Sequence, residues 1–317
     1  MQYSLVSRFR GALLGSFVGE ILGSVGCQGR VLGKATLTPP KPGNTLASET
    51  LSDWSKIATC GTESLIRCGR LDVEDWLRQC GLSHPSLLLL KTAASSSEAA
   101  VATLPMALFF HEDEVKLRQE LLTCAAVWLH DSEAYEGVLA VGYAIALALT
   151  EKLDFATLIP RIITYLGTQE TPLVQKLEQV QTLLEQGAGL ETTLTQLRRD
   201  DQLRSERSDR SDTSIALAFY CFLSTPEDFR ICITRAARSG YQTQTTAALT
   251  GALSGVYNSI TGMPVSWRLW VNRTSLGVQR LQLADRLLAV WSGVYDVSTV
   301  DQYQLATVAA PRVIQAR

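Results

Sequence analysis

The stretch "GALLGSFVGEILGSVG", residues 11–26, decides the fold through the spacing of its glycines. Gly11, Gly15, Gly19 and Gly23 recur every four residues, which places them along one face of a helix. A glycine inside a helix costs up to about 1 kcal/mol relative to alanine, so four of them require a packing reason. In lipid such a stripe would suggest a dimerising helix, but the run lacks the length to span a bilayer. We therefore predict a central buried helix whose backbone is closely approached by its neighbours.

Composition and charge exclude several classes of function. The chain has 317 residues, is 46% apolar and carries a formal net charge of −2, so it can form a large core but has no overall field that attracts nucleic acid or an anionic membrane. Its seven cysteines are odd in number and include no C-x-x-C pair. This pattern favours reduced core thiols over a disulfide framework. We therefore expect a cytoplasmic protein that binds neither nucleic acid nor membranes.

Two apolar stretches are candidates for a signal peptide or a membrane span. Residues 11–26 follow Arg8 and Arg10 as a signal peptide would, but Glu20 interrupts the run and no small-residue cleavage site closes it. The second stretch, residues 137–149, is too short to cross a bilayer. The sequence thus predicts a soluble protein without a transmembrane segment.

The rest of the chain has the pattern of a helical protein. Apolar residues recur at spacings of three and four, and alternating strand patterns are scarce. Helix starts are marked at Asp72, at Ser95 with Glu98 in capping-box spacing, and at Thr225 before a proline. At average helix length, this predicts roughly a dozen or more helices.

Two segments interrupt the helical pattern without dividing the chain into separate cores. Residues 34–50 are rich in Pro, Thr, Gly and Ser and are predicted to form a long loop. Residues 198–212 carry five positive and five negative charges, which favours a solvated or disordered insert over a nucleic-acid patch. We expect residues 1–317 to form a single domain.

A second stretch, "SGYQTQTTAALTGALSG" at residues 239–255, has the pattern of a ligand-presenting turn that runs into a helix of small residues. Gln242 and Gln244 alternate, which predicts that their side chains lie on the same side of an extended turn. Such a turn can hold two carboxylates for a metal, but here it holds two neutral amides.

These stretches resemble the ADP-ribosylglycohydrolases. Residues 8–23, "RFRGALLGSFVGEILG", are similar to that family's opening, R-x-x-G-x-x-x-G-x-x-x-G-D-A-x-G, and residues 214–255 are similar to a C-terminal helix that leads into G-D-T-D-T-x-A-A-x-x-G-A-L-x-G. The resemblance runs from about residue 8 to residue 270. It implies a compact, all-α, orthogonal multi-helix bundle. It also implies an activity, cleavage of the N- or O-glycosidic bond between ADP-ribose and a protein side chain, with two Mg²⁺ or Mn²⁺ ions in a central cleft.

The family's metal-binding positions are largely replaced in this chain. The D-T-D-T motif corresponds to residues 242–245, "QTQT", and a T-D-D-T motif corresponds to residues 52–55, "SDWS". Asp53 is therefore retained, whereas Trp54 replaces the second aspartate and Glu20 takes the place of the N-terminal one.

The family's substrate loop, often G-N-G-x-x-M-R-x-x-P, falls on residues 96–105, "SSEAAVATLP". Ser96, Ser97 and Glu98 replace its Gly, Asn and Gly, and Pro105 persists. The family's Thr-His turn corresponds to Leu129 and His130, so the histidine is retained.

This departure changes the chemistry that the cleft can support. Mg²⁺ favours charged oxygen ligands, and two such ions bring four positive charges into one cleft. Ser52, Asp53 and Thr245 remain as possible metal ligands, but one retained aspartate is too few for a dinuclear site. Without metal, the ribose hydroxyls and the attacking water lose their template and Lewis acid. We therefore expect no metal cofactor and assign no catalytic residue, keeping Glu20 and Asp53 as candidates.

The individual residues have competing interpretations. Asp53 is a metal ligand, a relic of the family's site or a helix N-cap. Trp54 is a plug in the former metal volume or a platform for base stacking. His130 is a structural histidine or a proton shuttle. The candidate ligand-binding residues, carried over by family position, are Ser52, Asp53, Trp54, Ser97, Glu98, His130, Gln242, Gln244 and Thr245.

Three functions follow from these positions. The leading hypothesis is a degenerate, non-catalytic relative, a pseudoenzyme that binds an ADP-ribose-like ligand or a protein partner. The alternative is an active ADP-ribosyl glycohydrolase with a one-metal or metal-free site. The third is a purely structural scaffold. The resemblance further implies that residues 52–55 and the helix that begins near Gln244 converge beside the glycine-rich N-terminal helix.

Overall fold

The computed structural model describes residues 3–32, 51–82, 94–130, 134–167, 171–199 and 207–294, and within these ranges all regular structure is helical. The predicted all-α class is confirmed. The loop expected at residues 34–50 lies outside the described residues. The helices are α1 (Leu5–Leu32), α3 (Asp53–Cys68), α4 (Val73–Gln79), α6 (Ser96–Ala102), α7 (Leu104–Phe109), α8 (Glu114–Trp128), α9 (Tyr135–Leu149), α10 (Leu158–Leu166), α11 (Pro172–Glu185), α12 (Leu190–Leu197), α13 (Arg207–Leu223), α14 (Phe229–Arg238), α15 (Thr243–Gly262), α16 (Val265–Arg273) and α17 (Ser275–Trp291).

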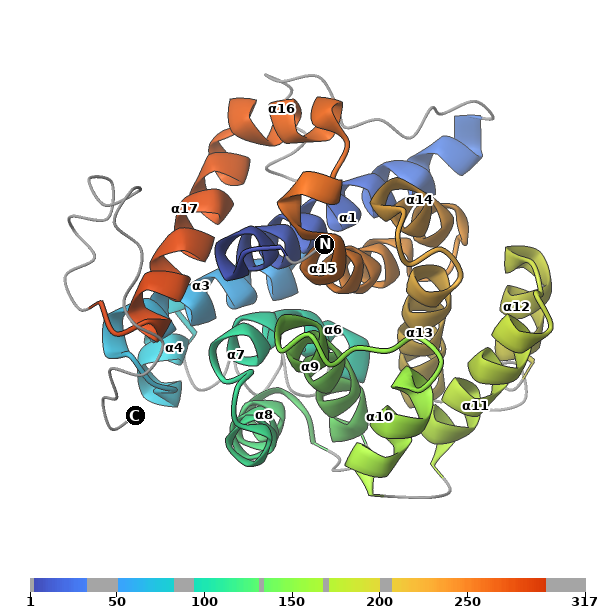
Figure 1. Ribbon diagram of the computed structural model, residues 1–317, viewed down its shortest axis with the longest axis horizontal. Coiled ribbons are helices and arrows are strands. Elements are labelled where there is room, and N and C mark those ends of the chain that lie inside the picture. The colour runs from blue at the N-terminus through green and yellow to red at the C-terminus, as the bar shows by residue number, and fades with distance from the viewer. Residues whose placement is uncertain are drawn as a thin grey trace.

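A glycine seam joins α1 to α15 in the middle of the molecule (Figure 1). A methyl group on Gly15 would lie 2.0 Å from the carbonyl oxygen of Gly251, and one on Gly251 would lie 2.0 Å from the carbonyl oxygen of Gly15. Gly11 and Gly255 face each other in the same reciprocal way. The two backbones therefore touch without side chains between them. The close approach predicted from the four-residue spacing is confirmed.

The other helices surround this pair. Helices α14 and α17 pack on α1, and α13, α9 and α6 pack on α15 (Figure 1). Phe17 of α1 stacks on Trp270 of α16, with ring centroids 5.6 Å apart. Glu20 follows Gly19 of the seam and lies in the interior of the protein.

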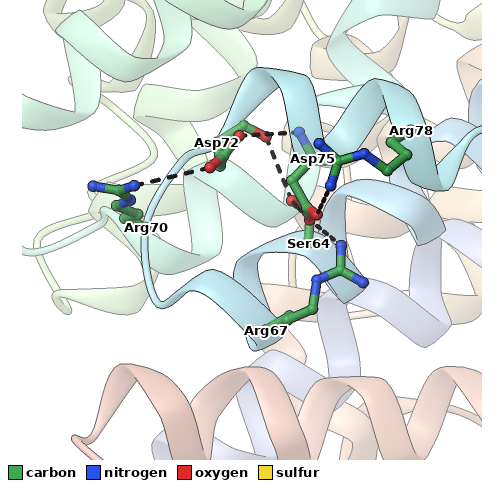
Figure 2. Close-up of polar contacts among 6 residues, drawn as sticks. All are labelled: Ser64, Arg67, Arg70, Asp72, Asp75 and Arg78. Atoms are coloured by element: carbon green, nitrogen blue, oxygen red, sulfur yellow. Dashed lines mark hydrogen bonds and ion pairs between the residues drawn. The ribbon is translucent and has the colours of Figure 1, made fainter.

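The junction of α3 and α4 is held by a network of charges around Asp75 (Figure 2). Asp72 caps α4 by accepting a hydrogen bond from the backbone N–H of Asp75 at 3.0 Å, as the sequence predicts. The Asp75 carboxylate accepts hydrogen bonds from Ser64 Oγ at 2.7 Å and from the Arg67 guanidinium. The bond from Arg67 is the main cause of a lowered pKa of Asp75.

Two further helix starts were predicted, at Ser95 and at Thr225. The capping box of Ser95 and Glu98 is confirmed at the start of α6. The predicted start at Thr225 is wrong, because Asp228 is the N-cap of α14 and accepts a hydrogen bond from the backbone N–H of Ile231 at 2.9 Å. Asp228 lies one residue before the apolar repeat of α14, so it caps this helix in place of Thr225.

The charged segment at residues 198–212 is shorter than expected as an insert. Its last residues, from Arg207, already form the first turns of α13. Ser211 is fully buried, and its Oγ accepts a hydrogen bond from the backbone N–H of Ser97 at 2.6 Å. The prediction of a solvated insert is therefore wrong for Ser211, because the end of the charged segment continues into helix α13.

No helix in the described ranges is both long enough and apolar enough to cross a bilayer.

Candidate functional site

Glu20 is the buried acid of the candidate site. Its side chain is on α1, and the residue is 1% exposed. One oxygen, Oε1, accepts hydrogen bonds from the backbone N–H of Ser52 at 2.6 Å and from Gln244 Nε2 at 3.3 Å. The other oxygen, Oε2, is buried and has no hydrogen-bond partner among the described residues. A buried acceptor without a partner costs about 1–3 kcal/mol, so Oε2 is the position in this cluster best prepared to accept a hydrogen-bond donor.

These contacts confirm the predicted convergence of three separate segments. Ser52 is the N-cap of α3, and its Oγ accepts a hydrogen bond from the backbone N–H of Ser55 at 3.2 Å. The Thr243 hydroxyl donates to the carbonyl oxygen of Gly23 at 2.8 Å, which fixes the start of α15 on the glycine-rich helix. The glycine seam therefore positions the beginning of α15 next to Glu20, and the hydrogen bond from Ser52 holds the beginning of α3 to the same carboxyl oxygen.

A buried arginine completes this part of the site. Arg280 of α17 is 5% exposed, and its Nη2 donates to the carbonyl oxygen and to the Oγ of Ser55, at 3.0 and 2.9 Å. Burial lowers the pKa of Arg280, while the negative charge of Glu20 acts in the opposite direction. The guanidinium is thus a fixed positive charge that interacts with Glu20.

Arg280 is the residue that the sequence interpretation missed. It lies beyond the stretch on which the family resemblance rests. A signal was nevertheless present in the helical pattern, because Arg280 shares the buried stripe of α17 with Gly277, Ala284 and Leu287. An arginine at a core-facing position of an amphipathic helix requires a buried partner.

The turn that carries the two glutamines differs from its prediction. Gln242 is the N-cap of α15 with φ 38° and ψ 47°, in the left-handed region, and α15 begins at Thr243. The turn is therefore not extended, because a left-handed N-cap leads directly into the helix. Gln244, half-buried, faces Glu20, whereas exposed Gln242 accepts a hydrogen bond from Ser97 Oγ at 3.5 Å. A left-handed glutamine costs of order 1–3 kcal/mol, and such strain concentrates at ligand-binding turns.

The start of α6 faces Gln242 and forms the second part of the site. Ser97 is fully buried, and its Oγ lies 3.3 Å from Ser95 Oγ. Glu98 accepts hydrogen bonds from the backbone N–H of Ser95 at 3.0 Å and from Ser95 Oγ at 2.7 Å. Glu98 therefore serves the capping box, and Ser97 is the residue of this segment that reaches the glutamine turn.

Other candidates lie away from this cluster. The Asp53 side chain is 74% exposed and pairs with Lys56 at 2.9 Å on the surface. The Trp54 ring packs edge-on against Trp128 in the core, with centroids 5.8 Å apart. His130 is exposed just after α8, and Thr245 is partly exposed in the first turn of α15. The structure thus brings together Glu20, Ser52 and Gln244, links Ser97 to Gln242, and places Asp53 and Trp54 in other surroundings.

A cavity of about 560 Å³ lies elsewhere, on the surface between α8, α9 and α10. Its lining includes the stacked rings of Tyr143 and Tyr165, which are 4.0 Å apart. Arg118, also in the lining, donates hydrogen bonds to the carbonyl oxygens of Tyr165 and Leu166 at the end of α10. That arginine caps a helix, and the cavity is separate from the Glu20 cluster.

Comparison with known proteins identifies the family. The model of the ADP-ribosylglycohydrolase family matches residues 1–296, and the chain belongs to this family. A solved structure described as an ADP-ribosylglycohydrolase-related protein complex aligns with a TM-score of 0.59 and 19% identity, covering 90% of this chain and 99% of that one. At this identity the alignment shows a shared fold. A search of curated proteins gives no match.

The side chains of the cluster do not fit the two divalent ions that the family implies. No group of three or more His, Cys, Asp or Glu side chains in the described ranges is arranged to hold a metal. In the cluster itself, Glu20 brings the carboxyl group, and the other groups are amides, hydroxyls and backbone N–H. The positive charge of the Arg280 guanidinium acts on Glu20, and it opposes the binding of a cation there. This donor set suits a ligand that donates hydrogen bonds rather than a pair of hard cations.

Proposed function

We propose that this chain is a non-catalytic member of its family that binds an ADP-ribose-like ligand or a protein partner without a metal. The observation that carries the proposal is the buried Oε2 of Glu20, which has no hydrogen-bond partner among the described residues while its neighbours are neutral or cationic. A hydroxyl or N–H of a ligand would satisfy that oxygen. Ribose hydroxyls are donors of this kind.

The arrangement supports binding more than turnover. In a metal-dependent glycohydrolase, divalent ions would orient the ribose and activate water, and this cluster offers no donor set for them. Glu20 would orient a ligand by accepting from it. Gln244 and Ser52 would hold the Glu20 carboxyl group in place, and Gln242 with Ser97 would present polar groups at the α6 side.

The test combines binding with turnover. Titration calorimetry in the presence of a chelator should detect binding of ADP-ribose. Glu20→Gln replaces the free acceptor with an N–H₂ donor and should weaken binding about tenfold or more, because a mispaired buried polar group costs about 1–3 kcal/mol. Asp53→Asn, at an exposed side chain of the same family motif, is the matched control and should leave binding unchanged.

The competing functions give different results. Hydrolysis of ADP-ribosyl-arginine peptides that requires Mg²⁺ and stops with chelator would overturn the proposal in favour of an active enzyme. Chelator-resistant turnover lost in Glu20→Gln would indicate a metal-free hydrolase. A structural scaffold would be indicated if the protein does not bind ADP-ribose and does not capture a protein partner in a way that depends on Glu20.

A further inference from the structure

Helices α3 and α4 meet in a close contact that involves the backbone of α3. Trp76 Nε1 of α4 donates a hydrogen bond to the carbonyl oxygen of Ile57 at 2.9 Å. A methyl group on Gly61 would lie 2.9 Å from the Cε2 atom of the same ring. The ring of Trp76 therefore rests directly on the backbone of α3, and residues that flank this contact on the two segments are brought together.

Two cysteines flank the contact. Cys60 immediately precedes Gly61, and Cys80 follows one turn after Trp76, where its backbone N–H donates to the Trp76 carbonyl oxygen at 3.1 Å. The contact brings the two thiols close enough for each to shift the pKa of the other. Both are free and partly exposed, whereas Cys124, Cys221 and Cys232 are free but buried. The pair is thus accessible to a small solute.

The two thiols have different acidities. The interaction with Cys80 is the main cause of a lowered pKa of Cys60, and the charge of Arg280 acts in the same direction. Burial and the nearby carboxylate of Glu63 oppose this effect. The pKa of Cys80 is raised, first by its interaction with Cys60. Cys60 is therefore the member that reaches the nucleophilic thiolate more readily.

We propose that Cys60 and Cys80 form a redox-reactive dithiol that hydrogen peroxide oxidises to a disulfide joining α3 to the end of α4. The Cys60 thiolate attacks one peroxide oxygen, the O–O bond breaks, and Cys60 sulfenic acid and hydroxide form. The Cys80 sulfur then attacks the Cys60 sulfur, the S–O bond breaks, and water leaves with the Cys80 proton. Two thiols are oxidised and one peroxide is reduced to water. This inference is independent of the proposed ligand-binding function.

The sequence makes the test direct, because trypsin separates the relevant cysteines. Cleavage after lysine and arginine leaves Cys60 in residues 57–67, Cys68 in residues 68–70 and Cys80 in residues 79–91. The full-length protein would be treated with hydrogen peroxide, its remaining thiols alkylated, and its peptides analysed by mass spectrometry with and without reduction. We expect a reducible cross-link between peptides 57–67 and 79–91.

Cys68→Ser is the matched control, because Cys68 is also a partly exposed thiol of α3. It should leave the cross-link intact, while Cys60→Ser and Cys80→Ser should each abolish it. No cross-link under conditions that oxidise Cys60, or a cross-link from Cys60 to Cys68 instead, would overturn the proposal.

The order of the steps has its own test, which needs no disulfide. In Cys80→Ser the sulfenic acid on Cys60 cannot be resolved, so a dimedone probe should label peptide 57–67. In Cys60→Ser the probe should leave Cys80 unlabelled. Equal labelling of the two variants would contradict the assignment of Cys60 as the attacking thiol. Circular dichroism of both variants would verify that each is folded.

Discussion

Glu20 and Arg280 are opposite charges held inside the protein by different helices, and the charge of Glu20 acts on the pKa of Arg280. Arg280 is buried and is hydrogen-bonded to Ser55, while Glu20 is hydrogen-bonded to Ser52 at the same end of α3. Removal of one member leaves the other as an uncompensated buried charge. The interior around Glu20 therefore contains a positive charge, supplied by a side chain of the protein itself.

This interaction predicts that loss of Arg280 alone destabilises the protein more than loss of both charges. Arg280→Met should lower the free energy of unfolding by about 3 kcal/mol or more, since it strands Glu20. Glu20→Gln in the same chain should recover part of that loss, because the stranded charge is removed. Urea unfolding of the single and double variants measures both effects.

The control for this cycle is Arg273→Met at the end of α16, where the arginine is exposed. It should change stability by no more than about 0.5 kcal/mol. An Arg280→Met variant as stable as Arg273→Met, or a double variant less stable than Arg280→Met, would show that the two charges are not coupled.

The two glutamines of the turn should respond differently to a negative charge. Gln244→Asp places a second carboxyl group beside Glu20, so one of the two pKa values must rise, by roughly 1–2 units or about 1–3 kcal/mol. A carboxyl group whose pKa is raised in the folded state destabilises the fold at neutral pH, and the loss shrinks as pH falls. We expect the unfolding free energy of Gln244→Asp to approach that of the parent near about pH 4.

Gln242→Asp is the matched control two residues away, because Gln242 is exposed. It should be neutral or slightly stabilising, since aspartate is a better N-cap and tolerates the left-handed region. Millimolar Mg²⁺ should not restore the Gln244→Asp variant, because the positive charge of Arg280 still acts on Glu20 and opposes a cation there. Restoration by Mg²⁺, or equal effects of the two substitutions, would contradict this account of the turn.

At the scale of elements, the glycine seam is the contact that most strictly limits the sequence. Gly15→Ala would bring a methyl group to 2.0 Å from the Gly251 carbonyl oxygen, and backbone atoms cannot move aside as a flexible side chain can. The helices would have to separate along their length. We expect a loss of about 3 kcal/mol or more, at the upper end of overpacking effects, measured by urea unfolding.

Gly189→Ala at the N-cap of α12 serves as the comparison, since a methyl group there would meet no atom within 4 Å. Its effect should be less than about 1 kcal/mol. If Gly15→Ala were tolerated as well as Gly189→Ala, the seam would not be the close backbone contact described.

The junction of α3 and α4 should make an acid-sensitive contribution to stability. The pKa of Asp75 is lowered in the folded protein from its ordinary value of 3.8, mainly by the hydrogen bond from Arg67. Its contribution is therefore fully present above that value and is lost as pH falls through the lower folded pKa. Asp75→Asn should remove this acid-side loss, so its stability curve should be flatter than the parent's below about pH 4.

Asp53→Asn tests whether any surface carboxylate has the same effect. Asp53 and Lys56 form an exposed pair, with side chains 74% and 58% exposed, and such pairs contribute little. The acid limb of its stability curve should match that of the parent. Equal flattening in the two variants would assign the acid sensitivity to general surface charge instead of to Asp75.

At the scale of the whole molecule, the spacing of apolar residues predicted the all-α class, and glycine spacing predicted the close approach to α1. The meeting of the motifs was predicted from the family resemblance. The partner of the seam was readable too, since Gly251 and Gly255 repeat the four-residue spacing. The end of the charged segment was missed because charge does not distinguish a solvated run from the first turns of a helix. Arg280 was missed because its partners are distant in sequence, and local patterns carry no information about them.

The composition of the site also predicts how the whole molecule responds to divalent ions. An intact site would stabilise the fold by about 2.7 kcal/mol at a hundredfold excess of ion over its Kd. With Arg280 beside the buried carboxyl group, we expect millimolar Mg²⁺ or Mn²⁺ to leave the melting temperature unchanged. An upward shift that disappears in Glu20→Gln would reveal a functional ion site.

The glycine seam has a consequence for how the protein is made. Helix α1 leaves the ribosome before its partner α15, which begins about 240 residues later. At about 5–20 residues per second, α1 waits roughly 10–50 s for the surface that covers its glycine face. During translation an apolar helix therefore remains without its native neighbour. We expect ribosome-associated chaperones to bind it during that time. Slowed translation between the two helices should raise the yield of aggregated chains without changing the stability of those that fold.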